Sequence, residues 1–386
     1  MIGLLTGSLI TTGALAQITT DQLNGQINTI STAVPFLRIT SDARAAAMGD
    51  AGIATSADAN SIYWNPAKLS FAENTVGLTA SYTPWLRQLV NDIYLANISG
   101  YKQLDDKQTL AASLVYFDLG NITFTNITGE PIGDFSPNEF VTTVAYARKL
   151  SDYFSTGIAL KFIYSNLAAG QNVGGTTIKA GKAAAADISA YYERDIKISD
   201  FKSKFAFGTN ISNVGSKITY TESIDKDFIP INLGIGTALD IEVDDYNDIT
   251  FAFDINKLLV PTPDTLDINA NGIPDFKEKG VVSGMFGSFT DAPGGFSEEI
   301  AELMYSFGVE YWYSDQFAIR AGYFNEHSTK GNRKYITAGL GLKLNVFGLN
   351  VSYLIPSNSQ RNPLDNTLRF TLLFNFDKSK EGGSTG

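Results

Sequence analysis

The segment from Asp267 to Glu278, with the sequence DINANGIPDFKE, has the side-chain spacing of a calcium-binding loop. It fits the pattern D-x-[DN]-x-[DN]-G-x5-E, in which oxygen ligands at alternate positions let one turn of chain wrap a hard cation. The predicted ligands are Asp267, Asn269, Asn271, Asp275 and Glu278. Two prolines precede the segment where a calcium-binding helix-loop-helix would have a helix, and ordinary acidic loops share this composition. A weak structural Ca²⁺ site and a plain solvated loop both remain open.

The single histidine, His327, is the only residue of its type that a catalytic triad or an imidazole metal site could use. It stands in the polar stretch NEHSTK beside Glu326 and Ser328. A general base needs an orienting partner and a nucleophile within reach, and neighbouring residues on an extended loop seldom converge. We therefore expect a solvated loop histidine and no enzymatic activity.

A short amphipathic stretch, GGFSEEIAELMYSF, follows the calcium-like segment. Ser297 stands where a helix cap belongs, and the next two residues are acidic, as favours a helix N-terminus. In a helix, Ile300, Leu303 and Met304 share one apolar face. This helix either packs on its own loop or docks a partner protein, and the length of the loop favours docking.

The elements that must position these loops are strands, because the chain alternates apolar and polar residues over most of its length. In NTLRFTLLFNF, every second residue from Leu368 to Phe376 is apolar. Fourteen such segments are present, and strands that cross a membrane as a closed barrel need about 9–11 residues. Their centres lie near Leu78, Leu95, Leu114, Val144, Leu160, Ile188, Phe207, Ile235, Phe251, Val309, Ile319, Leu340, Val351 and Leu372. We predict an all-β fold, a 14-stranded antiparallel transmembrane β-barrel.

The connections between these segments alternate in length, as outer-membrane barrels require. Those after the third, fifth, seventh, ninth and thirteenth segments are long, and those after the fourth, eighth, tenth and twelfth are tight. With the N-terminus in the periplasm, every long loop faces outward, and the longest spans residues 256–303. The sixth connection, around Glu193 to Lys202, is of middling length and fits this alternation least.

The predicted barrel is too wide for its inward side chains to fill. The charged inward positions are Lys161, Asp254, Glu310, Arg320, Lys343 and Arg369, with many Gly and Ala residues between them. An open pore and a plug both satisfy this geometry, and the Gly- and Ala-rich N-terminal residues are left over to form a plug. We predict a hatch over residues 17–72, with Pro66 at a turn. A periplasmic extension with no role inside the barrel is the alternative.

Composition excludes several classes of protein. The formal charge is −11, the pI is near 4.7, and no Lys/Arg cluster interleaves with aromatics, so we expect no nucleic-acid partner. The chain has no cysteine, which excludes disulfides and thiolate zinc sites. Residues 1–16 end in Ala14-Leu15-Ala16 and predict a signal peptide that lacks the usual basic start, with a buried first helix as the alternative. Residues 378–386 are expected to form a flexible tail.

The stretch SADANSIYWNPAKLS, residues 56–70, resembles the hatch motif of the FadL-type outer-membrane transport proteins. More narrowly, residues 34–69 are similar to the PorV (LptO) family, the FadL-like barrels of the type IX secretion system, and the related PorQ group shares the motif. The residues that carry the resemblance are Arg44, Gly49, Gly52, Trp64, Asn65, Pro66 and Ala67.

This resemblance implies a hatch inside a FadL-like barrel spanning residues 73–377, in the outer membrane of a Gram-negative bacterium. It also implies association with the large translocon barrel, reception of secreted proteins by their C-terminal signal domains, and delivery to the surface attachment machinery. Outer-membrane lipids would surround the wall, and no catalytic residues carry over. Uptake of hydrophobic compounds by a FadL-type channel is the alternative function, and a general porin is the third.

Overall fold

The fold is taken from a computed structural model that describes residues 27–87, 90, 92–125, 128–173, 176–222, 226–264, 267–357 and 366–377. The predicted signal peptide and the predicted tail lie outside these described residues. No helix in the described part of the chain is long and apolar enough to cross a membrane.

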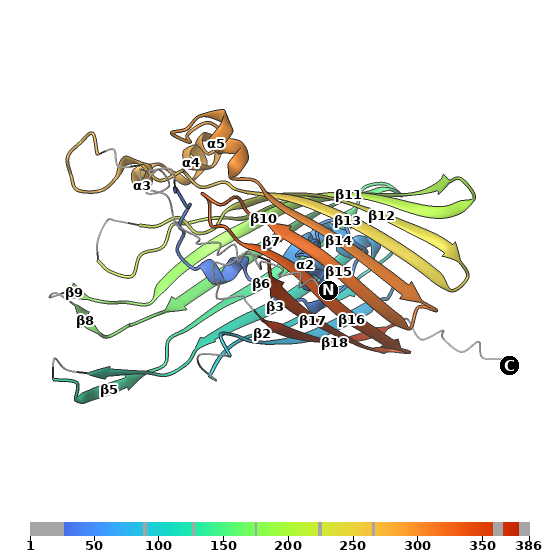
Figure 1. The fold of residues 1–386 in the computed structure, drawn as a ribbon, viewed down its shortest axis with the longest axis horizontal. Coiled ribbons are helices and arrows are strands. Elements are labelled where there is room, and N and C mark those ends of the chain that lie inside the picture. Colours follow the sequence, from blue (N-terminus) through green and yellow to red (C-terminus); the bar gives the residue numbers. More distant parts are fainter. Residues whose placement is uncertain are drawn as a thin grey trace, which may run out of the picture.

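Fourteen strands pair in sequence order and close into one antiparallel barrel (Figure 1). The wall strands are β1 (Val76–Pro84), β2 (Ile93–Gln103), β3 (Gln108–Leu119), β6 (Asn138–Lys149), β7 (Phe154–Asn166), β10 (Gly181–Ile198), β11 (Phe201–Gly215), β12 (Asn232–Asp244), β13 (Asn247–Leu258), β14 (Met304–Tyr313), β15 (Phe317–Asn325), β16 (Lys334–Leu344), β17 (Phe347–Pro356) and β18 (Leu368–Phe376). Every segment centre predicted from the sequence lies in a different wall strand, so the predicted fold class is confirmed.

Shorter elements stand outside the wall or inside the barrel. The hairpins β4 (Ile122–Thr125) with β5 (Pro131–Phe135) and β8 (Asn172–Val173) with β9 (Thr176–Thr177) extend two of the long loops. The N-terminal part contains η2 (Pro35–Arg38), α1 (Ala43–Ala47), α2 (Ser61–Trp64) and η3 (Pro66–Phe71), and the longest loop contains α3 (Asp275–Glu278), α4 (Val281–Gly287) and α5 (Phe296–Ala301).

The alternation of side chains decides which face of the wall meets lipid. In β18, Phe370 and Leu372 are exposed on the outer face, whereas Arg369 and Thr371 are buried on the inner face. This strand pairs with β1 from Val76 opposite Phe376 to Tyr82 opposite Phe370, which closes the barrel. Closure satisfies every backbone group of the wall without an edge in hydrocarbon.

The two ends of the barrel differ in the length of their connections. One end has tight turns, and the other has the long loops and α3–α5 (Figure 1). By the rule for outer-membrane barrels, the tight end is periplasmic. The sequence predicts a sixth connection of middling length, and this prediction is wrong, since only residues 199–200 separate β10 from β11. Alternation continues through both strands to Ile198 opposite Phe201, and the ladder therefore extends to the turn.

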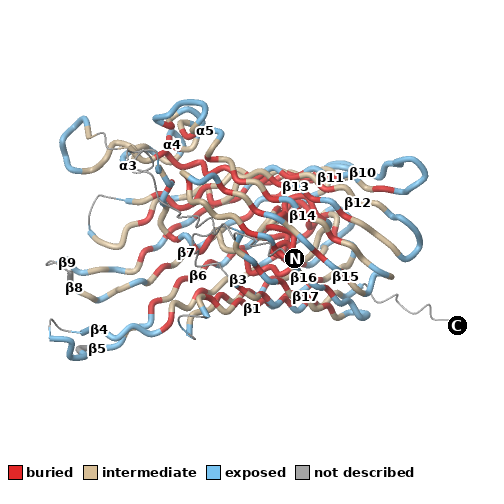
Figure 2. The backbone as a smooth tube through the Cα atoms, viewed as in Figure 1, coloured by how far each residue is buried: buried red, intermediate tan, exposed pale blue. Residues whose placement is uncertain are grey.

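Buried residues line the inside of the barrel over most of its length (Figure 2). Many of them are polar wall residues or small N-terminal residues rather than large aliphatic side chains. The interior is therefore a packed polar and small-residue core rather than a wide open pore.

The lipid-facing wall predicts a depth-dependent cost for charge. Leu160 lies in the middle of β7, and its side chain is exposed on the outer face. We expect Leu160→Arg to lower the free energy of unfolding by about 2–4 kcal/mol, because a guanidinium there faces hydrocarbon. Leu344→Arg, at the periplasmic end of β16, is the control and should cost under about 1 kcal/mol. Denaturant titration in lipid vesicles, followed by tryptophan fluorescence, measures both values, and equal costs would contradict the assigned membrane position.

Candidate functional site

The N-terminal segment, residues 27–75, enters the barrel from the extracellular mouth. The backbone N–H of Asn28 donates to the carbonyl of Thr329 at 3.0 Å, and that of Ala33 donates to Phe228 at 2.9 Å. Both acceptors lie in extracellular connections. The chain then descends to β1, which starts at the periplasmic end, as the blue trace beside α4 shows (Figure 1). The sequence placed the N-terminus in the periplasm, and the structure corrects this for residues 27–33.

Asp42 joins the two short helices of the N-terminal segment. Its carboxylate caps α1 by accepting from the backbone N–H of Arg44 at 2.9 Å. It also accepts from Asn60 Nδ2 at 3.2 Å and from the indole Nε1 of Trp64 at 3.1 Å. A buried carboxylate that accepts several hydrogen bonds holds its surroundings in one arrangement. Asp42 thereby fixes α1 against α2.

Arg44 ties α1 to the barrel wall through a buried ion cluster. Its Nη2 lies 2.6 Å from Oε1 of Glu310 in β14. Glu310 also accepts from Nε of Arg320 in β15 at 2.5 Å, and Arg320 donates to Asn350 of β17 at 2.9 Å. Breaking such a buried pair from one side is strongly destabilising, because it leaves an uncompensated charge. The cluster therefore holds the segment at one height in the lumen.

Glycines allow the backbone of the segment to touch the wall. Gly49 has a left-handed φ of 68°, and a Cβ on it would stand 2.6 Å from the backbone N of Tyr323. A Cβ on Gly322 would overlap the backbone of Met48 and Gly49. Only residues without a side chain fit on both sides of this contact.

Gly52 combines close packing with a wall contact. A Cβ on this residue would lie 2.5 Å from the ring of Trp64. The backbone N–H groups of Gly52 and Ile53 donate to one carboxylate oxygen of Asp254 in β13, at 2.7 and 2.9 Å. The inward acid noted in the sequence thus meets a turn of the N-terminal segment.

The Asn-Pro-Ala triplet anchors the segment to the opposite wall. Pro66 opens η3, where its missing N–H costs no hydrogen bond, and Asn65 caps the element by accepting from Ala67 N at 3.1 Å. Asn65 Nδ2 donates to the carbonyl of Ala190 in β10 at 3.1 Å. Ser155 of β7 donates to the carbonyl of Ala67 at 2.7 Å. The motif therefore contacts β7 and β10, far around the wall from Glu310.

We propose that the seven motif residues act together to seat the segment as a hatch. Their contacts with the wall are spread over β7, β10, β13, β14 and β15. They also contact other residues of the same segment, such as Asp42 and Ser56. Sequence reasoning identified the motif but not its wall partners. The inward charges Asp254, Glu310 and Arg320 were the available signal, since buried charges need partners.

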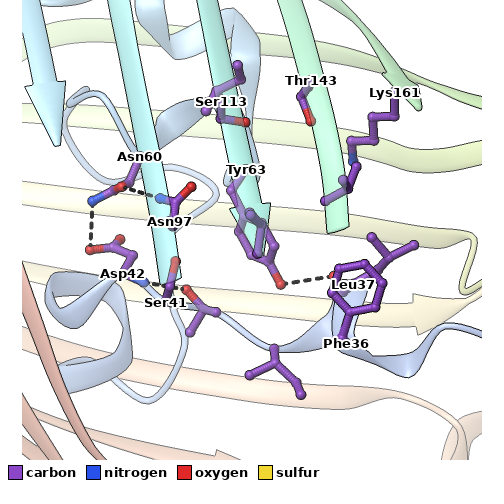
Figure 3. A pocket seen from close by; sticks show the side chains of 15 residues that line it. Phe36, Leu37, Ser41, Asp42, Asn60, Tyr63, Asn97, Ser113, Thr143 and Lys161 are labelled. Atoms are coloured by element: carbon purple, nitrogen blue, oxygen red, sulfur yellow. Dashed lines mark hydrogen bonds between the residues drawn. The ribbon is translucent and has the colours of Figure 1, made fainter. Parts of the chain in front are cut away.

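Two adjoining cavities lie in the lumen between the segment and the wall. They share Leu37, Thr40, Tyr63 and Lys161. Tyr63 donates its hydroxyl to the carbonyl of Leu37 at 3.2 Å, and its side chain points toward Leu37 (Figure 3). Their linings mix apolar side chains such as Phe36 with amides and cations, so they do not form a continuous apolar channel.

A second charged cluster closes the extracellular side of the larger cavity. Arg333 donates from Nε to Glu326 at 2.8 Å, and Arg38 of η2 lies 3.6 Å from the same carboxylate. Burial raises the pKa of Glu326, but the guanidinium of Arg333 outweighs this and holds that pKa below its ordinary value. Both arginines also contact Sδ of Met304, at 3.1 and 3.6 Å.

The predicted docking helix differs from the observed one. α5 begins after Gly295 rather than at a Ser297 cap and ends at Ala301, so Leu303 and Met304 lie beyond it. Met304 is buried as the first residue of β14, because the chain there joins the ladder opposite Asn256. The prediction that Ile300, Leu303 and Met304 share one face of a helix is therefore wrong. Of the three, only Ile300 lies on α5, and its side chain is exposed.

A buried ion cluster instead clamps α5 to the barrel rim. Lys257 at the end of β13 lies 3.0 Å from Glu299 and 2.5 Å from Glu302. Lys330 lies 3.0 Å from Glu302 and 2.5 Å from Glu298. Partial burial opposes ionisation of Glu298, but the hydrogen bond from Lys330 holds its pKa below the ordinary value. The cluster fixes the end of the longest loop to β13 and to the connection between β15 and β16.

The clamped loop presents large apolar side chains to solvent. On α4, Gly284 packs against Phe228 and Pro261, which turns the opposite side of the helix outward. The exposed apolar residues are Val282, Phe286, Phe289, Phe296 and Ile300. We name this set the apolar loop face. Phe296 is 80% exposed and Phe286 is 68% exposed, which is unusual for aromatic side chains on a fixed loop.

The predicted calcium ligands come together in one hydrogen-bonded turn. Asp267 accepts from the backbone N–H groups of Asn271 and Gly272, at 3.1 and 2.8 Å. Asn269 and Asn271 donate their side-chain amides to Glu278, at 2.8 and 2.7 Å. Asp275 accepts from Ile268 N at 3.3 Å.

This turn does not by itself form a metal site. In the described part of the chain, no group of three or more His, Cys, Asp or Glu side chains is placed to hold a metal ion. Binding would require Asn269 and Asn271 to turn their amide oxygens inward. Calcium binding by these residues therefore stays a prediction.

His327 lies on the extracellular connection between β15 and β16 and is exposed. Its Nδ1 lies 2.9 Å from the hydroxyl of Thr329, its neighbour two residues along. The contact is a local turn interaction.

Comparison with known proteins gives one family. The model of the family described as "Type IX secretion system protein PorV" matches residues 22–265. Among curated proteins, no sequence matches this chain.

The barrel is also similar to solved outer-membrane structures. The toluene transporter TodX of Pseudomonas putida is 11% identical, with 90% of this chain and 98% of that chain covered and a TM-score of 0.46. The toluene transporter TbuX of Ralstonia pickettii is 9% identical, with coverages of 86% and 97% and a TM-score of 0.45. A Pseudomonas aeruginosa FadL homologue is 10% identical, with coverages of 90% and 99% and a TM-score of 0.42.

The hatch proposal predicts the effect of a single methyl-bearing substitution. Gly322→Val should push the N-terminal segment off β15, because the new side chain would overlap the backbone of Met48 and Gly49. We expect the low conductance of the intact protein in planar bilayers to rise several-fold. Gly133→Val, where the added atoms meet open space, is the control and should change nothing. A large, steady conductance of the unaltered protein would show that the segment does not seal the lumen.

The calcium prediction is tested by titration calorimetry. The purified protein should bind one Ca²⁺ with a Kd of about 10⁻⁴–10⁻³ M, as extracellular sites do. Asp267→Ala should abolish the binding, because it removes the first ligand and both of its turn hydrogen bonds. Asp264→Ala, just before the turn, is the matched control. Identical heats for the wild type and Asp267→Ala would remove the site.

Proposed function

We propose a role in protein secretion for this chain, which belongs to the PorV family of type IX secretion system proteins and is an outer-membrane β-barrel. The protein works without catalysis. It associates with the large translocon barrel, receives secreted proteins through their C-terminal signal domains, and passes them to the surface attachment machinery. The family match, which covers 244 of 386 residues, is the observation that carries the proposal.

The filled lumen supports a carrier rather than a protein channel. The N-terminal segment contacts wall strands on several sides of the interior, through Glu310, Asp254 and Ala190 among others. A folded protein cannot pass between the segment and the wall. Partners therefore bind the outer wall, the turns or the loops.

The apolar loop face is the surface that fits a secreted or translocon partner best. Protein interfaces are enriched in aromatic side chains at their centre and are polar at their rim. Three phenylalanines form most of this face, and the ion cluster around Lys257 holds it in place before binding. Preorganisation of this kind lowers the entropy cost of association.

The negative charge of the loop indicates which charge a partner surface should carry. Residues 259–303 carry eight acidic and two basic side chains, a formal charge of −6. A partner with apolar residues ringed by Lys and Arg would match both features. The outer surface of the membrane would not match this loop, because its phosphate groups are negatively charged as well.

Uptake of hydrophobic compounds is the second candidate function, favoured by the smaller lumen cavity. Its lining includes Phe36, Ile39, Val115 and Val141. An uptake channel also needs a way out of the barrel, and the described wall pairs continuously around its circumference.

The secretion role predicts the phenotype of a deletion strain. Without this protein, cargo bearing type IX C-terminal signal domains should remain unreleased or unattached, while uptake of a fatty acid or an aromatic hydrocarbon stays normal. Surface fractions and uptake of labelled compound measure the two outcomes. Normal secretion with impaired uptake would favour the second candidate instead.

The docking surface predicts a sharper result for a surface variant. Val282→Ser with Phe286→Ser should weaken capture of cargo or of the translocon barrel at least roughly tenfold, since buried aromatic anchors dominate interface energy. The barrel should stay intact, because neither side chain packs inward. Ile122→Ser, an exposed apolar position on the β4–β5 hairpin, is the matched control. Pull-down from native membranes with a defined cargo domain measures capture, and equal capture by both variants would remove the apolar loop face as the docking site.

A further inference from the structure

The barrel wall has a step at its periplasmic end. β10 continues to Ile198, but its neighbour β7 begins at Phe154, opposite Tyr192. Residues 193–198 therefore extend beyond the first residue of β7. On its other side, β10 stays paired with β11 to the end, and β11 stays paired with β12 as far as Lys202 opposite Glu242. The long hairpin is visible at the periplasmic end of the barrel (Figure 1).

The projecting part of β10 has one unpaired edge. The backbone N–H of Glu193 points toward the β7 side and donates to Tyr153 O at 3.0 Å. Backbone groups alternate direction along a strand, so those of Asp195 and Lys197 point to the same side. Among the described residues, no strand stands there to pair with them. The edge thus offers two N–H and two C=O groups in register.

The side chains beside this edge also alternate. Ile196 and Ile198 lie on the outer face and are 37% and 39% exposed, while Asp195 and Lys197 lie on the inner face. Arg194 lies over the ring of Tyr153, with 5.6 Å between the guanidinium carbon and the ring centroid. Aromatic and basic side chains of this kind mark the membrane interface. Both isoleucines therefore lie past the apolar band of the membrane, beside an open edge.

We propose that this edge of β10 binds an extended segment of a periplasmic protein. The segment adds a strand to the wall at the position left open beyond the periplasmic end of β7. Strand addition uses main-chain hydrogen bonds for affinity and alternate side chains for specificity. The segment places apolar residues beside Ile196 and Ile198, and charged residues beside Asp195 and Lys197. Its length is about five residues, as the projecting edge allows.

A second copy of this chain cannot be the partner. Two identical edges pair antiparallel about a two-fold axis perpendicular to the sheet. Because the sheet here is the barrel wall, that axis lies in the plane of the membrane and would turn one barrel upside down. The occupant must therefore come from a different chain. This binding mode is independent of the extracellular docking surface proposed above.

Proline at Lys197 separates strand addition from other contacts at this site. Lys197→Pro removes an N–H that faces the open side and leaves the hydrogen bonds of β10 to β11 in place. Lys197→Ala removes the same side chain but keeps the N–H, and it is the matched control. A photoreactive amino acid at Ile198 in the full-length protein, irradiated in native membranes, is the probe. The same probe at Leu344, at the periplasmic end of the distant strand β16, reports background.

We expect one defined adduct at Ile198 in the wild type and in Lys197→Ala, and a yield roughly tenfold lower in Lys197→Pro. An adduct of equal yield in the proline and alanine variants would overturn strand addition, as would the absence of any adduct above the Leu344 background. Heat-dependent mobility in gels verifies that the variant barrels are folded, and Asp195→Pro with Asp195→Ala provides a second pair if Lys197→Pro does not fold. Because the readout is the adduct and not secretion, its failure leaves the proposed function untouched.

Discussion

The absence of water in the hydrocarbon core governs this molecule. Each backbone N–H and C=O in the wall must find a partner there, and antiparallel strands do this without exposing an edge only when they close. Closure with fourteen strands leaves an interior too wide for wall side chains to fill. The N-terminal segment occupies this space, and its motif residues bind the polar groups that the inner wall presents.

That packing explains why the interior is rich in small and charged residues. Gly49 and Gly322 bring two backbones into contact. Arg44 neutralises the charge of Glu310, a buried carboxylate that solvent does not reach. Because the segment fills the lumen, we expect large partners to be recognised at the two ends of the barrel. At the extracellular end, the ion cluster of Lys257 and Lys330 converts a long loop into a fixed surface.

Sequence alone predicted the strands and the sidedness of most loops, because both depend on local patterns. The period of two in β18 requires only the order of residues 368–376, and lengths of connections can be counted directly. The partner of Arg44 lies 266 residues away, and no local pattern encodes such a pair. The docking helix was misplaced for a similar reason, since register with Asn256 draws Met304 into β14 and ends α5 early. The entry of residues 27–33 from the extracellular mouth likewise depends on distant carbonyl groups, those of Thr329 and Phe228.

The same hydrocarbon constraint explains where an open edge is tolerated. An unpaired N–H costs several kcal/mol in lipid but little in water, so strands of unequal length must place their excess outside the membrane. β10 follows this rule, with Arg194 and Tyr153 at the interface and the unpaired part beyond them. A strand edge in water is usually protected by charge, and Asp195 and Lys197 give partial protection against unselective pairing. Ile196 lies between these two charged residues and is exposed. Protection of the edge does not explain why an apolar side chain is exposed there. A strand partner that covers the isoleucine and satisfies the edge accounts for both features at once.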